Sequence, residues 1–134
     1  MERRRREKKD LSNAPAVLYV DDEETNLKLF KRGFRRDFNI IITTSGQEAL
    51  EIIRSSNNVK LLITDQTMPE MKGTELIECV TSEFPELAKI ILTGFADNPE
   101  VIEAIDKFDV YECINKPYDK DSLMKILINI VGQV

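Results

Sequence analysis

Short apolar runs rich in β-branched residues alternate with amphipathic segments along most of the chain. The runs predict strands at residues 16–20, 39–43, 60–64, 89–92 and 110–114. Nearly every residue in these runs is apolar, which is typical of parallel strands whose two faces are both covered. The amphipathic segments between the runs have the spacing of helices packed on such a sheet. This order of strand and helix constrains the fold more than any other feature of the sequence.

Turn-forming residues mark the helix boundaries. Ser45 and Glu48 have the spacing of a capping box at the start of the second helix. Asn98 followed by Pro99 supplies an N-cap and a first-turn proline for the fourth helix, and Pro85 ends the third. We therefore predict an α/β fold with a doubly wound, five-stranded parallel sheet. It is of (βα)5 type, with right-handed crossovers and the flavodoxin-like strand order 2-1-3-4-5.

The length predicts one domain with a single core, because the chain has 134 residues. We expect this domain at residues 15–134 and interpret residues 1–14 as a basic, disordered tail or linker. The first ten residues hold six Lys/Arg and three Asp/Glu, although the whole chain carries a net charge of −5. The arginines at residues 3–6 could contact nucleic-acid phosphates. Neither interleaved aromatics nor a recognition helix accompanies them, so a nucleic-acid role is disfavoured.

Composition limits the compartment and the chemistry. No apolar run reaches the roughly 20 residues that a membrane span requires, and no apolar segment follows the basic N-terminus, so we expect a cytoplasmic protein. Cys79 and Cys113 lack metal-binding spacing and are interpreted as small core residues. The absence of histidine excludes Ser/His/Asp and Cys/His catalysis and most zinc sites. Carboxylates, hydroxyls, lysine and oxygen-binding metals remain.

Polar residues follow or end four of the predicted strands. In chain order they are Asp21 and Asp22 after the first, Asp65 after the third, Thr93 and Gly94 at the end of the fourth, and Lys116 after the fifth. Parallel strands end at one edge of a sheet, and ligands bind there, near the switch point between strands 1 and 3. Asp21 and Asp22 taken alone would be interpreted as helix-capping acids. Together with the other polar residues, they predict a site.

The predicted cluster has the composition of a cation and phosphoryl site. Three carboxylates held together raise each other's pKa values unless a cation neutralises them. Because only oxygen ligands are available, that cation should be Mg²⁺ or Mn²⁺. Lys116 adds a positive charge and Thr93 a hydroxyl donor, so the group forms a receptacle for a phosphoryl group. Asp65, which stands alone after the central strand, is the predicted nucleophile.

Four motifs resemble the receiver domains of two-component response regulators. They are VDDE at residues 20–23, LLITDQTMPEMKG at 61–73, ILTGFAD at 91–97 and INKPYD at 114–119. The resemblance extends over residues 16–131. It implies that Asp65 accepts a phosphoryl group from a phosphohistidine on a partner sensor histidine kinase or phosphotransfer protein.

The resemblance also implies a role for each residue of the site. The ligands that it implies for Mg²⁺ are Asp21 through a water molecule, Asp22, Asp65 and the backbone carbonyl of Thr67. Thr93 and Lys116 would bind the phosphoryl oxygens, and the Lys116–Pro117 bond would be cis, as it usually is in the family.

The implied function is a switch rather than a metabolic enzyme, since the only catalysis is self-directed phosphorylation and dephosphorylation. Phosphorylation would change the face formed by helix 4, strand 5 and helix 5. Receivers usually carry Tyr or Phe three residues before the lysine, where this chain has Cys113. Either Tyr111 or Phe95 substitutes for that aromatic, or signalling proceeds through loop movement alone. Tyr111 would share a strand face with Cys113.

Output and assembly are left open by the sequence. The output domain or effector partner is unknown, and the chain is either a stand-alone receiver or part of a longer protein. In the last helix, Met124, Ile128 and Val131 form a second apolar stripe. If exposed, the stripe predicts a homodimer through helices 4 and 5; otherwise neighbouring segments cover it.

Three other classes of function compete with the phospho-accepting module. A haloacid-dehalogenase-like phosphotransferase would place Asp-x-Asp after the first strand, where this chain has adjacent aspartates. A flavin- or nucleotide-binding module would need a glycine-rich phosphate loop, which is absent there. A non-phosphorylated interaction module is the third alternative.

Overall fold

The computed structural model describes residues 10–56 and 58–132. Its five strands are β1 (Ala16–Val20), β2 (Asn39–Thr43), β3 (Val59–Thr64), β4 (Ala88–Thr93) and β5 (Glu112–Asn115). They form one parallel sheet in the order β2-β1-β3-β4-β5. The predicted fold class and strand order are therefore confirmed.

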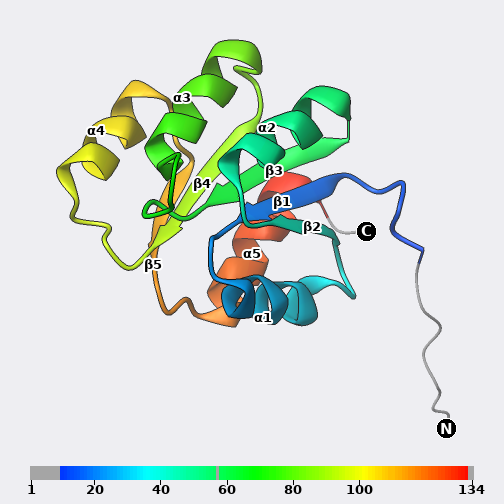
Figure 1. Cartoon of the computed structure of the whole chain (residues 1–134). Coiled ribbons are helices and arrows are strands. Elements are labelled where there is room, and N and C mark those ends of the chain that lie inside the picture. The colour runs from blue at the N-terminus through cyan, green and yellow to red at the C-terminus, as the bar shows by residue number, and fades with distance from the viewer. Residues whose placement is uncertain (1–9, 57, 133–134) are drawn as a thin grey trace, which may run out of the picture.

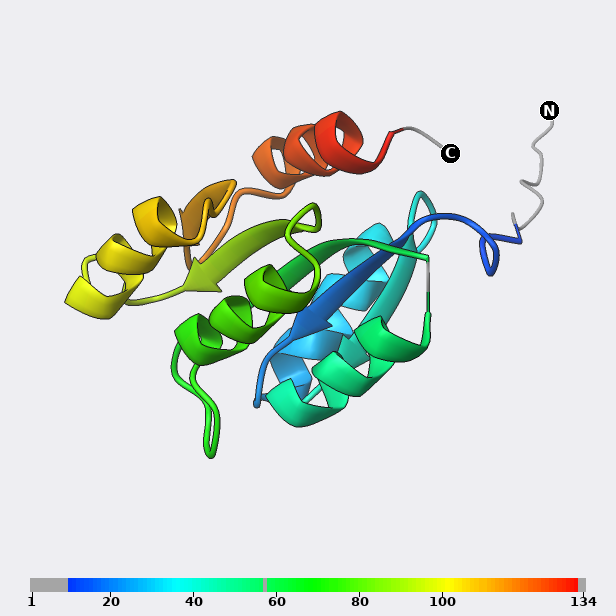
Figure 2. The ribbon, with the colours of Figure 1, turned by 90° about the horizontal axis from the view of Figure 1, so that it is seen from above.

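In the described residues, four helices connect the strands and a fifth follows β5, and together they cover both faces of the sheet. They are α1 (Glu24–Phe34), α2 (Gly46–Ser55), α3 (Gly73–Glu83), α4 (Pro99–Lys107) and α5 (Lys120–Val131). Figure 1 shows α1 and α5 on one face and α2, α3 and α4 on the other, and Figure 2 shows the same layers from above. Because all strands are parallel, the loops that follow β1, β3, β4 and β5 leave the same edge.

The core divides along the sheet because alternate strand residues face opposite sides. In β1, Val17 and Tyr19 pack with Phe30 of α1 and Leu127 of α5. The residue between them, Leu18, packs on the other side with residues of α2 and α3. This covering of both faces explains the continuous apolar runs that predicted the strands.

The predicted start of the last strand is wrong. Residues 110 and 111 are predicted as strand because their side chains are apolar and aromatic. In the structure, β5 begins at Glu112, opposite Ile90 of β4. Asp109 has a φ of 54°, in the left-handed region, and the N–H of Val110 donates to the carbonyl of Ile105 in α4. The chain is therefore still turning out of α4 there. The placement of Tyr111 on the same face as Cys113 is also wrong, because the Tyr111 hydroxyl contacts Asn129 of α5, whereas Cys113 packs on the α4 side of the sheet. The other strands match their predicted bounds to within one residue.

The capping box predicted for α2 is only half formed. The Ser45 side chain accepts from the N–H of Glu48 at 3.1 Å, as expected. The Glu48 carboxylate does not return to the Ser45 N–H, because it takes the Thr43 hydroxyl instead. The Ser45 N–H donates to Thr43 Oγ1 at 3.3 Å.

The other helix boundaries agree with the sequence. Asn98 caps α4 by accepting from the N–H of Glu100, and Pro99 occupies the first turn. The third helix ends at Glu83, two residues before Pro85. Within the described residues, none of the helices combines the length and apolarity of a membrane span.

The second apolar stripe of α5 is largely covered. Met124, Ile128 and Val131 are half-buried and pack against the core beneath α1 and α5. Neighbouring segments thus account for most of the stripe, as the second of the two interpretations expected.

Residues near the start of the described chain contact the domain. The carbonyl of Ala14 accepts from the side-chain amides of Asn39 at 3.0 Å and Asn58 at 2.5 Å. Residues 1–9, which carry the basic run of the predicted tail, lie outside the described residues. The boundary between tail and domain at residue 15 stays a prediction.

Candidate functional site

Three aspartates meet at the carboxyl-terminal edge of the sheet. Asp21, Asp22 and Asp65 each offer a carboxylate oxygen, and these oxygens lie within 4.8 Å of one another. β1 and β3 are hydrogen-bonded neighbours, and the N–H of Asp65 donates to the carbonyl of Val20 at 2.9 Å. Residues that follow these two strands therefore emerge side by side, as the topology predicted.

Lys116 reaches into this cluster from the loop after β5. Its Nζ lies 2.6 Å from Asp21 Oδ2 and 3.3 Å from Asp65 Oδ2. Its backbone N–H donates to the carbonyl of Thr93 at 3.0 Å, which ties the loop to the end of β4. The Lys116–Pro117 peptide bond is cis, as expected. The Lys116 ammonium group thus partly neutralises the charge of two of the three acids.

The carboxylate of Asp21 is surrounded by hydrogen-bond donors. Besides Lys116, Oδ2 accepts from the Tyr19 hydroxyl at 2.6 Å and from Asn26 Nδ2 at 3.2 Å. Oδ1 accepts from the backbone N–H of Glu23 at 2.9 Å. A carboxylate has about four lone-pair sites, so little capacity remains for a directly bound ion. Three of the four donors are on Oδ2, so Oδ1 is the oxygen of Asp21 that can still face a cation or a water molecule bound to it.

Burial and these contacts have opposite effects on the pKa values of Asp21 and Lys116. Burial is the largest influence on Asp21 and favours its neutral form, but the hydrogen bonds from Lys116, Tyr19 and the Glu23 backbone together outweigh it and lower the pKa of Asp21. Burial is also the largest influence on Lys116, yet its contacts with Asp21 and Asp65 outweigh it and raise the pKa of Lys116. Both groups are charged at neutral pH.

Asp22 and Asp65 differ from Asp21 in their surroundings. Asp22 is exposed, whereas Asp65 has a side chain 13% exposed. Asp65 Oδ1 accepts from the N–H of Gln66 at 2.7 Å, and Oδ2 faces Lys116. Thr67, two residues further on, is exposed at the start of the loop to α3.

Thr93 and Gly94 complete this edge of the sheet at the end of β4. Thr93 is fully buried, and its Oγ1 accepts from the N–H of Phe95 at 3.2 Å. A Cβ added at Gly94 would meet no heavy atom within 4 Å, so open space adjoins the strand end. The structure thus brings Asp21, Asp22, Asp65 and Lys116 into one cluster with Thr93 beside it.

The position of the usual switch aromatic and its two candidate substitutes have different surroundings. Cys113 is half-buried and packs with Ile91 and Val101 between the sheet and α4. The Tyr111 side chain is 47% exposed, and its hydroxyl accepts from Asn129 Nδ2 of α5 at 2.7 Å. Phe95 is 59% exposed in the loop before α4.

Sequence reasoning missed several residues that support the site. Tyr19 could have been found, because a residue two positions before Asp21 on a strand points to the same side. Asn26 and Gln66 gave no such signal, because their contacts depend on the paths of the loops.

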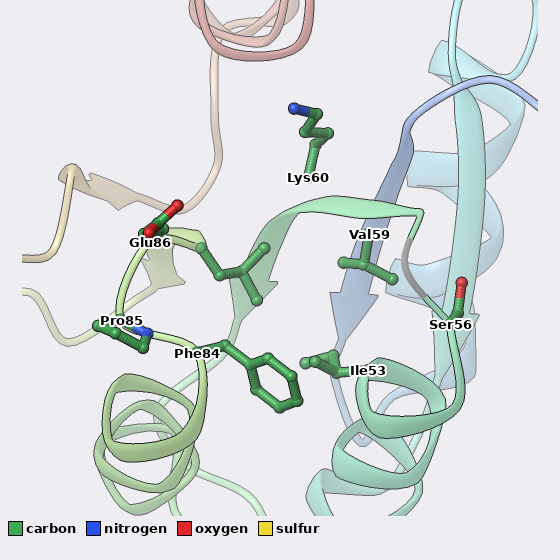
Figure 3. A pocket seen from close by; sticks show the side chains of 8 residues that line it. Ile53, Ser56, Val59, Lys60, Phe84, Pro85 and Glu86 are labelled. Atoms are coloured by element: carbon green, nitrogen blue, oxygen red, sulfur yellow. The ribbon is translucent and has the colours of Figure 1, made fainter.

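A cavity of about 440 Å³ lies at the opposite edge of the sheet, where β3 and β4 begin. Figure 3 shows Ile53, Val59 and Phe84 lining it with apolar surface while Lys60 points away. It contains none of the clustered acids and is separate from the site described above.

Comparison with known proteins identifies the family. The family described as the response regulator receiver domain matches residues 17–128. The chain belongs to this family. Receiver domains are phospho-accepting signalling modules of two-component systems, and this is the class of function of the chain.

Relatives include whole receiver proteins and longer regulators. A chemotaxis protein CheY homolog of Campylobacter jejuni is 32% identical over 120 residues, which cover 87% of this receiver domain's chain and 92% of that protein. The hydrogenase transcriptional regulatory protein HoxA of Cupriavidus necator is 29% identical over 108 residues, covering 81% of this chain and 22% of HoxA. The chain therefore spans about a fifth of that regulator's length.

Solved structures agree with the fold. A response regulator receiver domain protein from Clostridium thermocellum superposes with a TM-score of 0.81 at 28% identity, covering 87% of this chain and 94% of that chain.

Proposed function

We propose that Asp65 is the phosphoryl acceptor of this receiver domain and that a phosphohistidine on a sensor histidine kinase or phosphotransfer protein is the donor. The observation that carries the proposal is Lys116 Nζ, which lies within hydrogen-bond reach of both Asp21 and Asp65. In the transfer, a carboxylate oxygen of Asp65 forms a bond to phosphorus as the bond from the donor imidazole nitrogen breaks. The given sequence contains no histidine, so the phosphohistidine lies outside these 134 residues.

The acids fit a hard divalent cation. Their oxygens lie within 4.8 Å of one another, and no nitrogen or sulfur ligand is present among them. Mg²⁺, or Mn²⁺ in its place, would be held by Asp22, Asp65 and the Thr67 carbonyl, with Asp21 acting through water. When bound, the ion would neutralise charge on the phosphoryl oxygens.

Thr93 and Lys116 would bind the phosphoryl oxygens and pass the signal on. The Thr93 hydroxyl now accepts from the N–H of Phe95 and would turn to donate to the phosphoryl group. That movement changes the loop before α4 and so the face formed by α4, β5 and α5. Phe95, Tyr111 or the loop itself would present the change to an effector. The chain is enzymatic only in promoting its own phosphorylation and dephosphorylation.

Three further assignments belong to this proposal. The domain works in the cytoplasm, where sensor kinases phosphorylate their partners. Residues 1–14 form a tail or linker outside it. Association of two copies would use α4, where Ile102 is 57% exposed, together with the exposed side of α5.

The direct test is phosphorylation by acetyl phosphate with Mg²⁺, read by intact mass. We expect a gain of one phosphoryl group in the wild-type chain and none after Asp65→Asn. Asp106→Asn, an exposed aspartate of α4, is the matched control and should gain as much as wild type. No gain, or a gain that survives Asp65→Asn, would refute the assignment.

A further inference from the structure

The residue after Asp65 has a buried side chain that is bonded to the start of α3. Gln66 is 2% exposed. Its Oε1 accepts from the N–H of Thr74 at 2.9 Å, and its Nε2 donates to Thr74 Oγ1 at 3.2 Å. An amide side chain offers one acceptor and donors in fixed geometry, and here both kinds of group are used on one partner.

The backbone of Gln66 is tied at the same place. Its N–H donates to Asp65 Oδ1 at 2.7 Å, and its carbonyl accepts from the N–H of Gly73 at 3.0 Å. A Cβ added at Gly73 would lie 2.1 Å from the backbone oxygen of Asp65. The first turn of α3 thus sits directly against the end of β3, and residues 67–72 form a loop closed at its base.

The loop itself has few interior contacts. Thr67, Pro69, Glu70 and Lys72 are exposed, and only Met68 and Met71 pack against the core. A loop of this kind takes its conformation mainly from its two ends. The bonds between Gln66 and Thr74 are therefore well placed to fix where Thr67 and the Asp65 carboxylate lie.

We propose that Gln66 is a positioning residue whose paired bonds to Thr74 hold Asp65 Oδ1 and the Thr67 carbonyl in place for cation binding and phosphoryl transfer. This inference rests on the proposed function, since it assigns Thr67 and Asp65 to the cation. A neutral amide suits the position, because a carboxylate there would add a buried negative charge beside three acids. The competing explanation is that Gln66 only caps α3 by accepting one of its free N–H groups.

The test is the affinity for Mg²⁺, measured by titration calorimetry on the full chain. Gln66→Met keeps an unbranched side chain and removes both bonds. We expect the Mg²⁺ dissociation constant to rise about tenfold, as is typical when a group that orients a ligand is removed. The rate of phosphorylation by acetyl phosphate at saturating Mg²⁺ should also fall.

Variants of α3 separate the positioning role of the bonds between Gln66 and Thr74 from general packing. Thr74→Val removes only the hydroxyl acceptor, so it should raise the dissociation constant by less than Gln66→Met does, and Thr74→Ser should recover it. Combining Thr74→Val with Gln66→Met should add nothing to the effect of Gln66→Met alone. Thr81→Val is the matched control on the same helix, because Thr81 Oγ1 has no partner among the described residues.

The outcomes are decisive in each case. If Gln66→Met folds, as judged by circular dichroism, and keeps the wild-type dissociation constant and rate, Gln66 is only a cap and the proposal is overturned. If Gln66→Met does not fold, Thr74→Val decides in the same way. A wild-type chain that binds no Mg²⁺ also overturns it. If wild type binds Mg²⁺ but is not phosphorylated, the proposed function fails. The Mg²⁺ dissociation constants of wild type and Gln66→Met then still test whether Gln66 positions the cation ligands.

Discussion

The pair formed by Asp21 and Lys116 determines how the site responds to pH. The pKa of Asp21 is lowered in the folded chain, so this residue stabilises the fold above its unfolded pKa of about 3.9. That contribution is lost as the pH falls through the folded pKa. The pKa of Lys116 is raised, so its contribution is present below about pH 10.4 and is lost as the pH rises through its folded pKa. The pair therefore stabilises the fold between acidic and strongly basic pH.

Replacing Lys116 with methionine tests this account. Lys116→Met keeps most of the side-chain length but leaves the buried Asp21 without its cation. We expect a loss of about 1.5–3 kcal/mol in the free energy of unfolding at pH 7, the range for hydrogen bonds to charged groups. The loss should shrink toward acidic pH, because the buried Asp21 takes up a proton more readily in the variant, where the Lys116 contacts that lower its pKa are missing. Urea unfolding in EDTA across this range measures it.

The control is Lys28→Met, which removes an exposed lysine from α1. Its free energy of unfolding should stay within about 0.5 kcal/mol of wild type at every pH. A loss for Lys116→Met that is the same at pH 3 and pH 7 would contradict the role of the ion pair.

The backbone is closely packed at the junction between β3 and α3. Gly73 begins α3 where a Cβ would lie 2.1 Å from the Asp65 carbonyl oxygen and 3.1 Å from the Gln66 Cα. These neighbours are backbone atoms of the strand end, so they cannot swing aside. We expect Gly73→Ala to cost about 1–3 kcal/mol of stability, as overpacking does, and to slow phosphorylation by displacing Asp65. Urea unfolding and acetyl phosphate labelling measure the two effects.

Gly94 provides a matched comparison at the end of β4. A Cβ there meets no heavy atom within 4 Å, so Gly94→Ala should change the free energy of unfolding by less than about 0.5 kcal/mol. Equal losses for the two glycine variants would show that the close approach at Gly73 is not what matters.

The sequence predicts where most strands end, but not the contacts that depend on the paths of the loops. Strand ends were predictable because continuous apolar runs mark strands buried on both faces, and the parallel order then brings Asp21, Asp65 and Lys116 together. The start of β5 was not, because it depends on the left-handed turn at Asp109 and a bond back to α4. The bonds between Gln66 and Thr74 were equally hidden, since they join residues whose contact exists only once the loop has closed.

The sheet separates two different environments at its opposite edges. The carboxyl-terminal edge gathers three acids against one lysine, whereas the cavity at the other edge is lined largely by apolar side chains. Exposed ion pairs join neighbouring helices, Arg54 with Glu83 between α2 and α3 and Lys72 with Glu100 between α3 and α4. Such exposed pairs contribute little to stability. At the carboxyl-terminal edge, three acids face one lysine, and a bound cation would relieve this excess of negative charge.

Stability of the chain should consequently depend on Mg²⁺. An ion that binds only the folded state adds RT ln(1 + [L]/Kd), which is about 2.7 kcal/mol at one hundred times the dissociation constant. We expect the urea midpoint to rise with Mg²⁺ and the slope of the unfolding free energy against urea to stay constant. EDTA should reverse the change. Unfolding followed by circular dichroism measures it.

Asp22→Asn makes the origin of this effect testable, because it removes one exposed acid of the cluster while keeping its shape. In EDTA the variant should be at least as stable as wild type, since it has one fewer repulsive charge beside Asp21 and Asp65. In saturating Mg²⁺ the order should reverse, because the variant has lost a ligand and gains less from the ion. A variant that gains as much as wild type would place the ion elsewhere. The crossing of the two stabilities thus distinguishes a bound cation from general screening of charge, which would never reverse their order.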